Sequence, residues 1–114
     1  MPDSMRKDLR KLCAVADVDP RKGRIISLDD HDDILLVRQN DNVYAYSNRC
    51  PHANAHLNMN GERIIALDEY HILCTVHGAQ FNPVNGKCVL GPCKGQHLSA
   101  LNITIIDDEI CLLT

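Results

Sequence analysis

The chain has 114 residues, of which 45% are hydrophobic and 24% charged, so it is long enough for one domain with a single core. Its 12 lysines and arginines are outnumbered by 15 aspartates and glutamates, which gives a net charge of −3. Because the chain has no basic excess, we exclude the nucleic-acid-binding proteins as a class.

Residues 1–8 lack the apolar stretch of a signal peptide, and no run of 18 apolar residues occurs in the chain. We therefore expect a cytoplasmic protein without a membrane span. In a reducing compartment, paired cysteines are better interpreted as metal ligands than as disulfides.

The first half of the chain predicts short strands separated by polar turns. Residues 1–10 are charged and lack periodicity, so we expect a frayed start or a short helical turn there. Apolar runs predict the strands, and clusters of Gly, Pro, Asn and Asp predict the turns. The predicted strands are 12–15, 25–28, 34–37 and 43–46, with turns at 19–23, 29–32 and 40–42.

The second half continues the same pattern. The predicted elements are a hairpin formed by 62–67 and 70–73, strands 80–81 and 87–90 around a tight turn at 83–86, and a closing hairpin formed by 101–106 and 110–113. Roughly ten short strands without a convincing amphipathic helix predict an all-β fold, either an antiparallel sandwich or a barrel-like domain.

Two short clusters between these strands carry the chemistry. Cys50 and His52 form C-x-H, and Cys74 and His77 form C-x-x-H, with 21 residues between His52 and Cys74. Thiolate and imidazole bind zinc as well as iron–sulfur clusters, so ligand type alone leaves both open. The spacing in C-x-H is tighter than in the usual zinc knuckle, which favours an iron–sulfur centre.

The second cluster continues through Gly78, Ala79, Gln80 and Phe81, and glycines follow at Gly86 and Gly91-Pro92. Together these motifs resemble the Rieske iron–sulfur family. The resemblance implies one [2Fe-2S] cluster, with Cys50 and Cys74 on one iron and His52 and His77 on the other. It also implies a cluster-binding part, about residues 48–93, inserted into a basal β part formed by about 11–47 and 94–114.

Two positions depart from the respiratory members of this family. Those proteins place a serine and a tyrosine hydroxyl against the cluster sulfurs, where this chain has Ala79 and Phe81. Hydrogen bonds to the sulfurs raise the reduction potential. The absence of both hydroxyls therefore implies a low-potential, ferredoxin-like centre.

The respiratory proteins also have a disulfide between their two cluster loops. Its cysteines would fall at Ala55 and Val76, so that disulfide is absent here. Cysteines outside the motifs remain to be explained. Three of them lie in apolar, strand-like runs and are interpreted as small core or half-buried residues: Cys13, Cys88 and Cys111.

The resemblance implies a Rieske-type ferredoxin that carries single electrons from a flavin-containing reductase to a terminal oxygenase. The chain is too short to hold the mononuclear iron domain of an oxygenase, so we do not expect an enzyme. One alternative is the Rieske small subunit of a cytoplasmic nitrite reductase, which Cys-Pro-His and a similarly short chain also resemble. A second alternative is a zinc-stabilised interaction module without redox activity.

Overall fold

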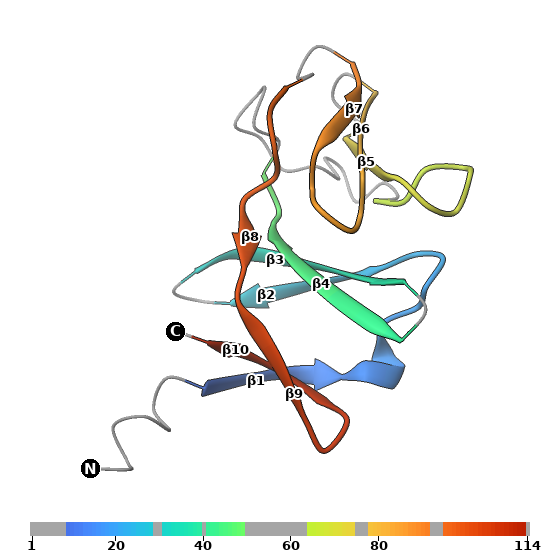
Figure 1. Ribbon diagram of the computed structural model, residues 1–114. Coiled ribbons are helices and arrows are strands. Elements are labelled where there is room, and N and C mark those ends of the chain that lie inside the picture. The colour runs from blue at the N-terminus through green and yellow to red at the C-terminus, as the bar shows by residue number, and fades with distance from the viewer. Residues whose placement is uncertain are drawn as a thin grey trace.

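The computed structural model describes residues 9–28, 31–39, 41–49, 64–74, 78–91 and 95–113. These residues form ten strands in three antiparallel sheets, and one short 3-10 helix, Val15–Asp17. None of these segments forms a helix long and apolar enough to cross a membrane. The molecule is elongated, with extents of 47 × 26 × 25 Å, and the three sheets follow one another along it (Figure 1).

The all-β prediction is confirmed, with separate sheets and no closed barrel among the described strands. The terminal sheet, in the order β1–β10–β9, contains Leu9–Ala14 (β1), Ile103–Ile106 (β9) and Glu109–Leu113 (β10). The middle sheet, in the order β2–β3–β4–β8, contains Arg24–Leu28, His31–Gln39, Asn42–Ser47 and Ala100–Leu101. The small sheet, in the order β5–β6–β7, contains Ile72–Cys74, Ala79–Phe81 and Cys88–Leu90.

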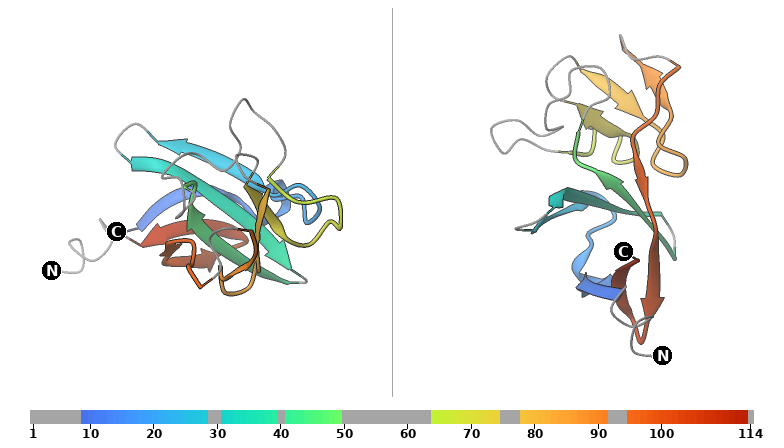
Figure 2. Two further views of the ribbon diagram at one scale, coloured as in Figure 1. Left: turned by 90° about the horizontal axis from the view of Figure 1, so that it is seen from above. Right: turned by 90° about the vertical axis from the view of Figure 1, so that its left-hand side faces the viewer.

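The middle sheet lies between the other two, as the right-hand view of Figure 2 also shows. Ile34 and Leu36 of β3 belong to the core shared with the terminal sheet, whereas Leu35 and Val37 belong to the core shared with the small sheet. Side chains alternate between the faces of a strand, so a strand covered on both faces needs an apolar residue at every position. The uninterrupted apolar run 34–37 is therefore the central strand of the fold.

In its described part, the predicted hairpin at 62–73 has less strand pairing than expected. Ile65 and Ile72 form a single bridge, and Leu73 N donates to the carbonyl of Ile64 at 2.8 Å. Strand pairing continues only from Ile72, because the chain before it bends through a turn in which Glu69 has a φ of 60°. The first predicted strand of this hairpin is therefore wrong for the residues that the structure describes.

The predicted strand 101–106 is divided between two sheets. β8 pairs with β4 in the middle sheet, whereas β9 pairs with β10 in the terminal sheet. Asn102 lies between the two strands, and its carbonyl accepts a hydrogen bond from Leu113 N at 2.9 Å. A continuous apolar run in the sequence does not reveal that the chain crosses from one sheet to another, because each half of the run faces a different core.

Two strands begin earlier than predicted. β1 begins at Leu9, which pairs with Leu113, and β3 begins at His31, which pairs with Leu28. We had assigned these residues to the frayed start and to a turn because they lie among charged side chains. Backbone pairing extends a strand whatever the polarity of its exposed residues, so the polar composition predicted the ends incorrectly.

The hairpin between β9 and β10 has two central residues in the left-handed region, Asp107 with φ 52° and Asp108 with φ 64°. Ile106 pairs with Glu109, so this is a two-residue turn of type I′, which favours glycine at its second position. We expect Asp108→Gly to raise the free energy of unfolding by about 1 kcal/mol, because a Cβ disfavours this conformation. Urea denaturation measures the change. Asp108→Ala is the control, since it removes the same carboxylate but keeps the Cβ, and an equal gain from alanine would contradict the prediction.

Candidate metal centre

Of the four predicted ligands, Cys74 lies in the described part of the chain, whereas Cys50, His52 and His77 lie outside it. Cys74 is the last residue of β5, is fully buried and takes no part in a disulfide. It pairs with Ala79, the first residue of β6. The C-x-x-H motif therefore begins where β5 ends, in the connection between two paired strands.

Apolar side chains surround Cys74. Ile72 and Phe81 form the next pair of the β5–β6 ladder, and both are fully buried in the same core cluster as Cys74. Positions two apart on a strand share a face, so Cys74, Ala79 and Phe81 all face this core. An apolar shell of this kind controls the access of water to a metal site.

The turn before β5 is fixed by Asp68. Its carboxylate accepts hydrogen bonds from the backbone N–H groups of Tyr70 (2.9 Å) and His71 (3.0 Å), and lies 2.6 Å from Nδ1 of His71. The hydrogen bond with the His71 ring, followed by the two N–H groups, lowers the pKa of the Asp68 carboxyl to about 2. Asp68 is therefore ionised at neutral pH, and its bonds set the path by which the chain enters β5 and reaches Cys74.

The chain approaches the first motif from β4, which ends at Ser47, three residues before Cys50. Asn48 is buried, and its backbone N–H donates to the carbonyl of Asp33 at 2.9 Å. Arg49 N donates to the carbonyl of Ser47 at 2.8 Å. These bonds fix the path of the chain as far as the residue before Cys50.

Tyr46 of β4 connects this segment to the small sheet. Its buried hydroxyl donates to the carbonyl of Pro83, in the turn between β6 and β7, at 2.8 Å. Burial, and then the neighbouring Tyr44, raises the pKa of Tyr46 to about 12, so the hydroxyl remains a donor at neutral pH. A Cβ at Gly86 would lie 2.8 Å from the Tyr46 ring, so this turn fits against the ring only with glycine.

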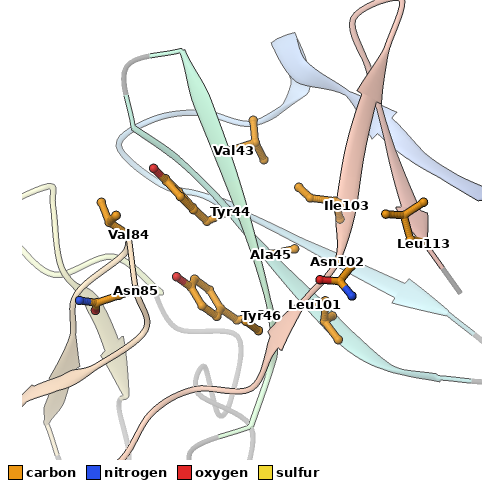
Figure 3. A pocket seen from close by; sticks show the side chains of 11 residues that line it. Val43, Tyr44, Ala45, Tyr46, Val84, Asn85, Leu101, Asn102, Ile103 and Leu113 are labelled. Carbon is orange, nitrogen blue, oxygen red and sulfur yellow. The ribbon is translucent and has the colours of Figure 1, made fainter.

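A groove of about 410 Å³ lies beside this link, between β4, the turn after β6 and the segment 100–103 (Figure 3). Tyr44 and Tyr46 line it together with mostly apolar side chains. None of the described residues that line it is a predicted ligand. Among the described residues, the groove is therefore separate from Cys74.

The other described cysteines behave in two ways. Cys13 and Cys111 lie in β1 and β10 of the terminal sheet and are not in disulfides, and burial raises the pKa of the Cys13 thiol. Cys88 is buried as predicted but takes part in a disulfide, contrary to our expectation of a core thiol. Its partner is outside the described part of the chain. A disulfide requires two Cβ atoms at a particular separation, which cysteine spacing in a sequence does not reveal.

The chain matches the Rieske [2Fe-2S] domain family over residues 8–107. A search of the curated proteins gave no match. Among solved structures, the ferredoxin of carbazole 1,9a-dioxygenase from Nocardioides aromaticivorans IC177 is 26% identical, with a TM-score of 0.73 over 92% of this chain and 96% of that one. A chain from a complex of reduced oxygenase and oxidised ferredoxin in carbazole 1,9a-dioxygenase is 25% identical, with a TM-score of 0.75 and 93% coverage of both chains.

A putative small subunit of an NADPH nitrite reductase is also similar. It is 21% identical, with a TM-score of 0.66 over 93% of this chain and 98% of that one. At this identity the likeness shows the fold alone.

The match over residues 8–107 defines an iron–sulfur protein, and the antiparallel all-β domain with a buried cysteine at the start of the C-x-x-H motif agrees with that class. The chain belongs to the Rieske [2Fe-2S] domain family. This confirms the predicted family and its cofactor, a single [2Fe-2S] cluster. Cys74, the predicted ligand that the structure describes, is a buried thiol and fits such a cluster, because thiolates and imidazoles are the ligands that its irons take.

Cys74→Ala should abolish assembly of the cluster, because one iron would lose a thiolate ligand. Cys111→Ala is the matched control, since it makes the same change at a buried cysteine of the terminal sheet. We expect the Cys74 variant to be colourless and the Cys111 variant to keep its iron. Visible absorbance and iron content measure both. A normal iron content in Cys74→Ala would remove this residue from the ligand set.

Proposed function

We propose that Cys50 and Cys74 hold one iron of the cluster and His52 and His77 the other. We further propose that the protein is a low-potential Rieske-type ferredoxin, which carries single electrons from a flavin-containing reductase to a terminal oxygenase. Its membership in the Rieske family, with both motifs inside the matched range, is the observation that carries this proposal.

The local structure supports the ligand assignment. Cys74 stands at the end of β5 with its side chain in an apolar core, and backbone hydrogen bonds fix the chain as far as Arg49, next to Cys50. The Tyr46 hydroxyl holds the strand before the first motif to the sheet that carries the second. A cluster bound between the motifs would accept and release one electron. The residues described here would hold it in place and limit its contact with water.

The carrier role is supported by the kinds of protein that share the fold. The ferredoxins similar to this chain are covered over 93–96% of their length, so the likeness extends over nearly all of them. One of them was solved together with an oxygenase. In this proposal the protein is a component of an oxidoreductase system and is not itself an enzyme.

The small subunit of a nitrite reductase is the second candidate. The solved structure with that description covers nearly the whole chain, which supports this alternative at the level of the fold. Its TM-score of 0.66 is below the values of 0.73 and 0.75 for the two ferredoxins, and its identity is lower. We therefore place the separate carrier first.

A low potential is supported by the side chains beside Cys74. Ala79 and Phe81 are both fully buried in the core cluster that contains Cys74, and neither has a hydroxyl group. Donors to the sulfurs of the cluster stabilise its reduced form. Without donors at these two positions, the reduced form is less stable and the potential is lower.

Rieske centres span roughly −150 to +300 mV, and we expect this one to lie below about 0 mV. Ala79→Ser and Phe81→Tyr should each raise the potential. Both substitutions add a hydroxyl on the buried face of β6, the face that contains the residue paired with Cys74. Gln80→Ser is the control, since it adds a hydroxyl on the opposite face of the same strand. Voltammetry on the purified holoproteins measures the shifts. A wild-type value well above about +150 mV, or no upward shift from either buried hydroxyl, would show that other groups set the potential.

The carrier role can be tested with the reductase and oxygenase of a carbazole 1,9a-dioxygenase system as probes. We expect the reductase and its nicotinamide donor to bleach the visible absorbance of the protein. Oxygenase, substrate and oxygen should then restore the absorbance, since each turnover withdraws electrons from the carrier. Cys74→Ala protein is the control for transfer without a cluster. Isolation from cells as a fixed complex with a nitrite reductase large subunit, together with no transfer in this assay, would favour the second candidate.

A further inference from the structure

β9 is an edge strand of the terminal sheet. Among the described strands only β10 pairs with it, because the sheet has the order β1–β10–β9. Leu113 N donates to the carbonyl of Asn102 at 2.9 Å, and the backbone bonds of an antiparallel ladder involve every second residue of a strand. The N–H and C=O groups of Ile103 and Ile105 therefore point away from β10, toward the open edge.

The opposite edge of the same sheet is protected against further pairing. β1 contains Arg10 and Lys11, and its register with β10 shifts between Lys11 and Cys13, which marks a bulge. Charged side chains and bulges are two means by which edge strands avoid pairing with other chains. β9 has neither, since its sequence is Ile-Thr-Ile-Ile and its pairing with β10 has no shift. This edge therefore favours the addition of another strand.

β9 also exposes apolar side chains. Ile105 is 42% exposed and Ile106 44%. Exposed apolar residues beside unpaired backbone groups form the surface that a partner covers when it adds a strand to a sheet. An added strand would cover these side chains and pair the backbone groups of the edge.

The groove of about 410 Å³ lies beside this edge. Ile103 and Asn102 line it on one side and Val43 of β4 on the other (Figure 3). If Ile103 of one copy pairs with Ile105 of a second copy, the same register places Ile106 of the second copy opposite Asn102. The mostly apolar groove could then receive this exposed residue and remove it from water.

We propose that two copies of this chain associate through β9, with their β9 strands paired antiparallel about a two-fold axis. The strand is complementary to itself, because the outward-facing Ile103 of each copy can pair with the outward-facing Ile105 of the other. β9 carries no charge, and antiparallel pairing keeps the acidic turns at Asp107 and Asp108 at opposite ends of the paired strands. Parallel pairing would place these carboxylates side by side.

The proposed interface is small, since it consists of one four-residue strand and one groove on each copy. Specific, stable interfaces bury at least about 1,200 Å² in total, so we expect a transient dimer with a Kd between about 10 µM and 1 mM. The terminal sheet lies at the opposite end of the molecule from the small sheet (Figure 1). Cys74 therefore lies outside the paired strands, and the proposal does not depend on electron transfer.

The test compares the association of Ile105→Lys and Val89→Lys holoproteins by sedimentation equilibrium over a range of concentrations. Val89, the bulged residue between Cys88 and Leu90 in β7, is 41% exposed, and its replacement changes the net charge equally. We expect Ile105→Lys to weaken association at least about tenfold, because a charged lysine disfavours pairing at an edge. Val89→Lys should associate like the wild type.

Amide hydrogen exchange, measured residue by residue by NMR, locates the interface. The N–H groups of Ile103 and Ile105 should exchange more slowly as the concentration rises, because pairing protects them. Thr104 is the internal control, since its N–H already faces β10.

A wild-type protein that remains monomeric at about 1 mM would overturn the proposal. Equal association of the two lysine variants would also overturn it, as would a dimer in which the N–H groups of Ile103 and Ile105 gain no protection. If Ile105→Lys does not fold, Ile105→Pro takes its place, because proline removes the outward N–H and leaves the bonds to β10 intact. Unchanged association of that variant would then overturn the proposal.

Discussion

Burial of the middle sheet on both of its faces determines where the other two sheets lie. Leu35 and Val37 need a cover on one face of β3, and Ile34 and Leu36 need one on the other. Each such side chain contributes about 1.5–3 kcal/mol when it leaves water. The small sheet has three strands of three residues each, too few to form a core of its own. The sheet that carries Cys74 is therefore folded only while it covers the middle sheet.

Among the described residues, Tyr46 makes a polar contact between these two sheets. Its ring fills the core under the small sheet, and its hydroxyl reaches the carbonyl of Pro83 beyond β6. The same strand leads directly to the first motif. The Tyr46 side chain thus connects the strand that leads to the first pair of proposed ligands with the sheet that leads to the second pair. A carrier that changes charge by one electron benefits from such a link, because a rigid site reorganises little when the charge changes.

The sequence predicted most of this architecture because its signals are local. The apolar run 34–37 predicted a strand, which the structure shows to be buried on both faces, and Asp107 with Asp108 predicted the last turn. The motif around Cys74 was placed correctly, between two strands. What the sequence did not reveal depends on distant pairing. The bulge at Val89 and the crossing at Asn102 each require knowledge of which segment lies opposite.

Ala79 is where two physical effects on the potential meet. It lacks a hydroxyl that could donate to a sulfur, and its small size lets the backbone at Gly91 approach within van der Waals contact. The first effect removes a possible donor to the reduced cluster, and the second makes any larger side chain at position 79 displace the backbone at Gly91. Phe81 shares only the first effect, because its partner in β7 is Cys88 and not the glycine. A hydroxyl at position 81 therefore reports the effect of a donor alone, whereas one at position 79 also disturbs the packing against Gly91. A difference between the two positions therefore measures what the packing at Gly91 adds to the effect of a donor on the potential.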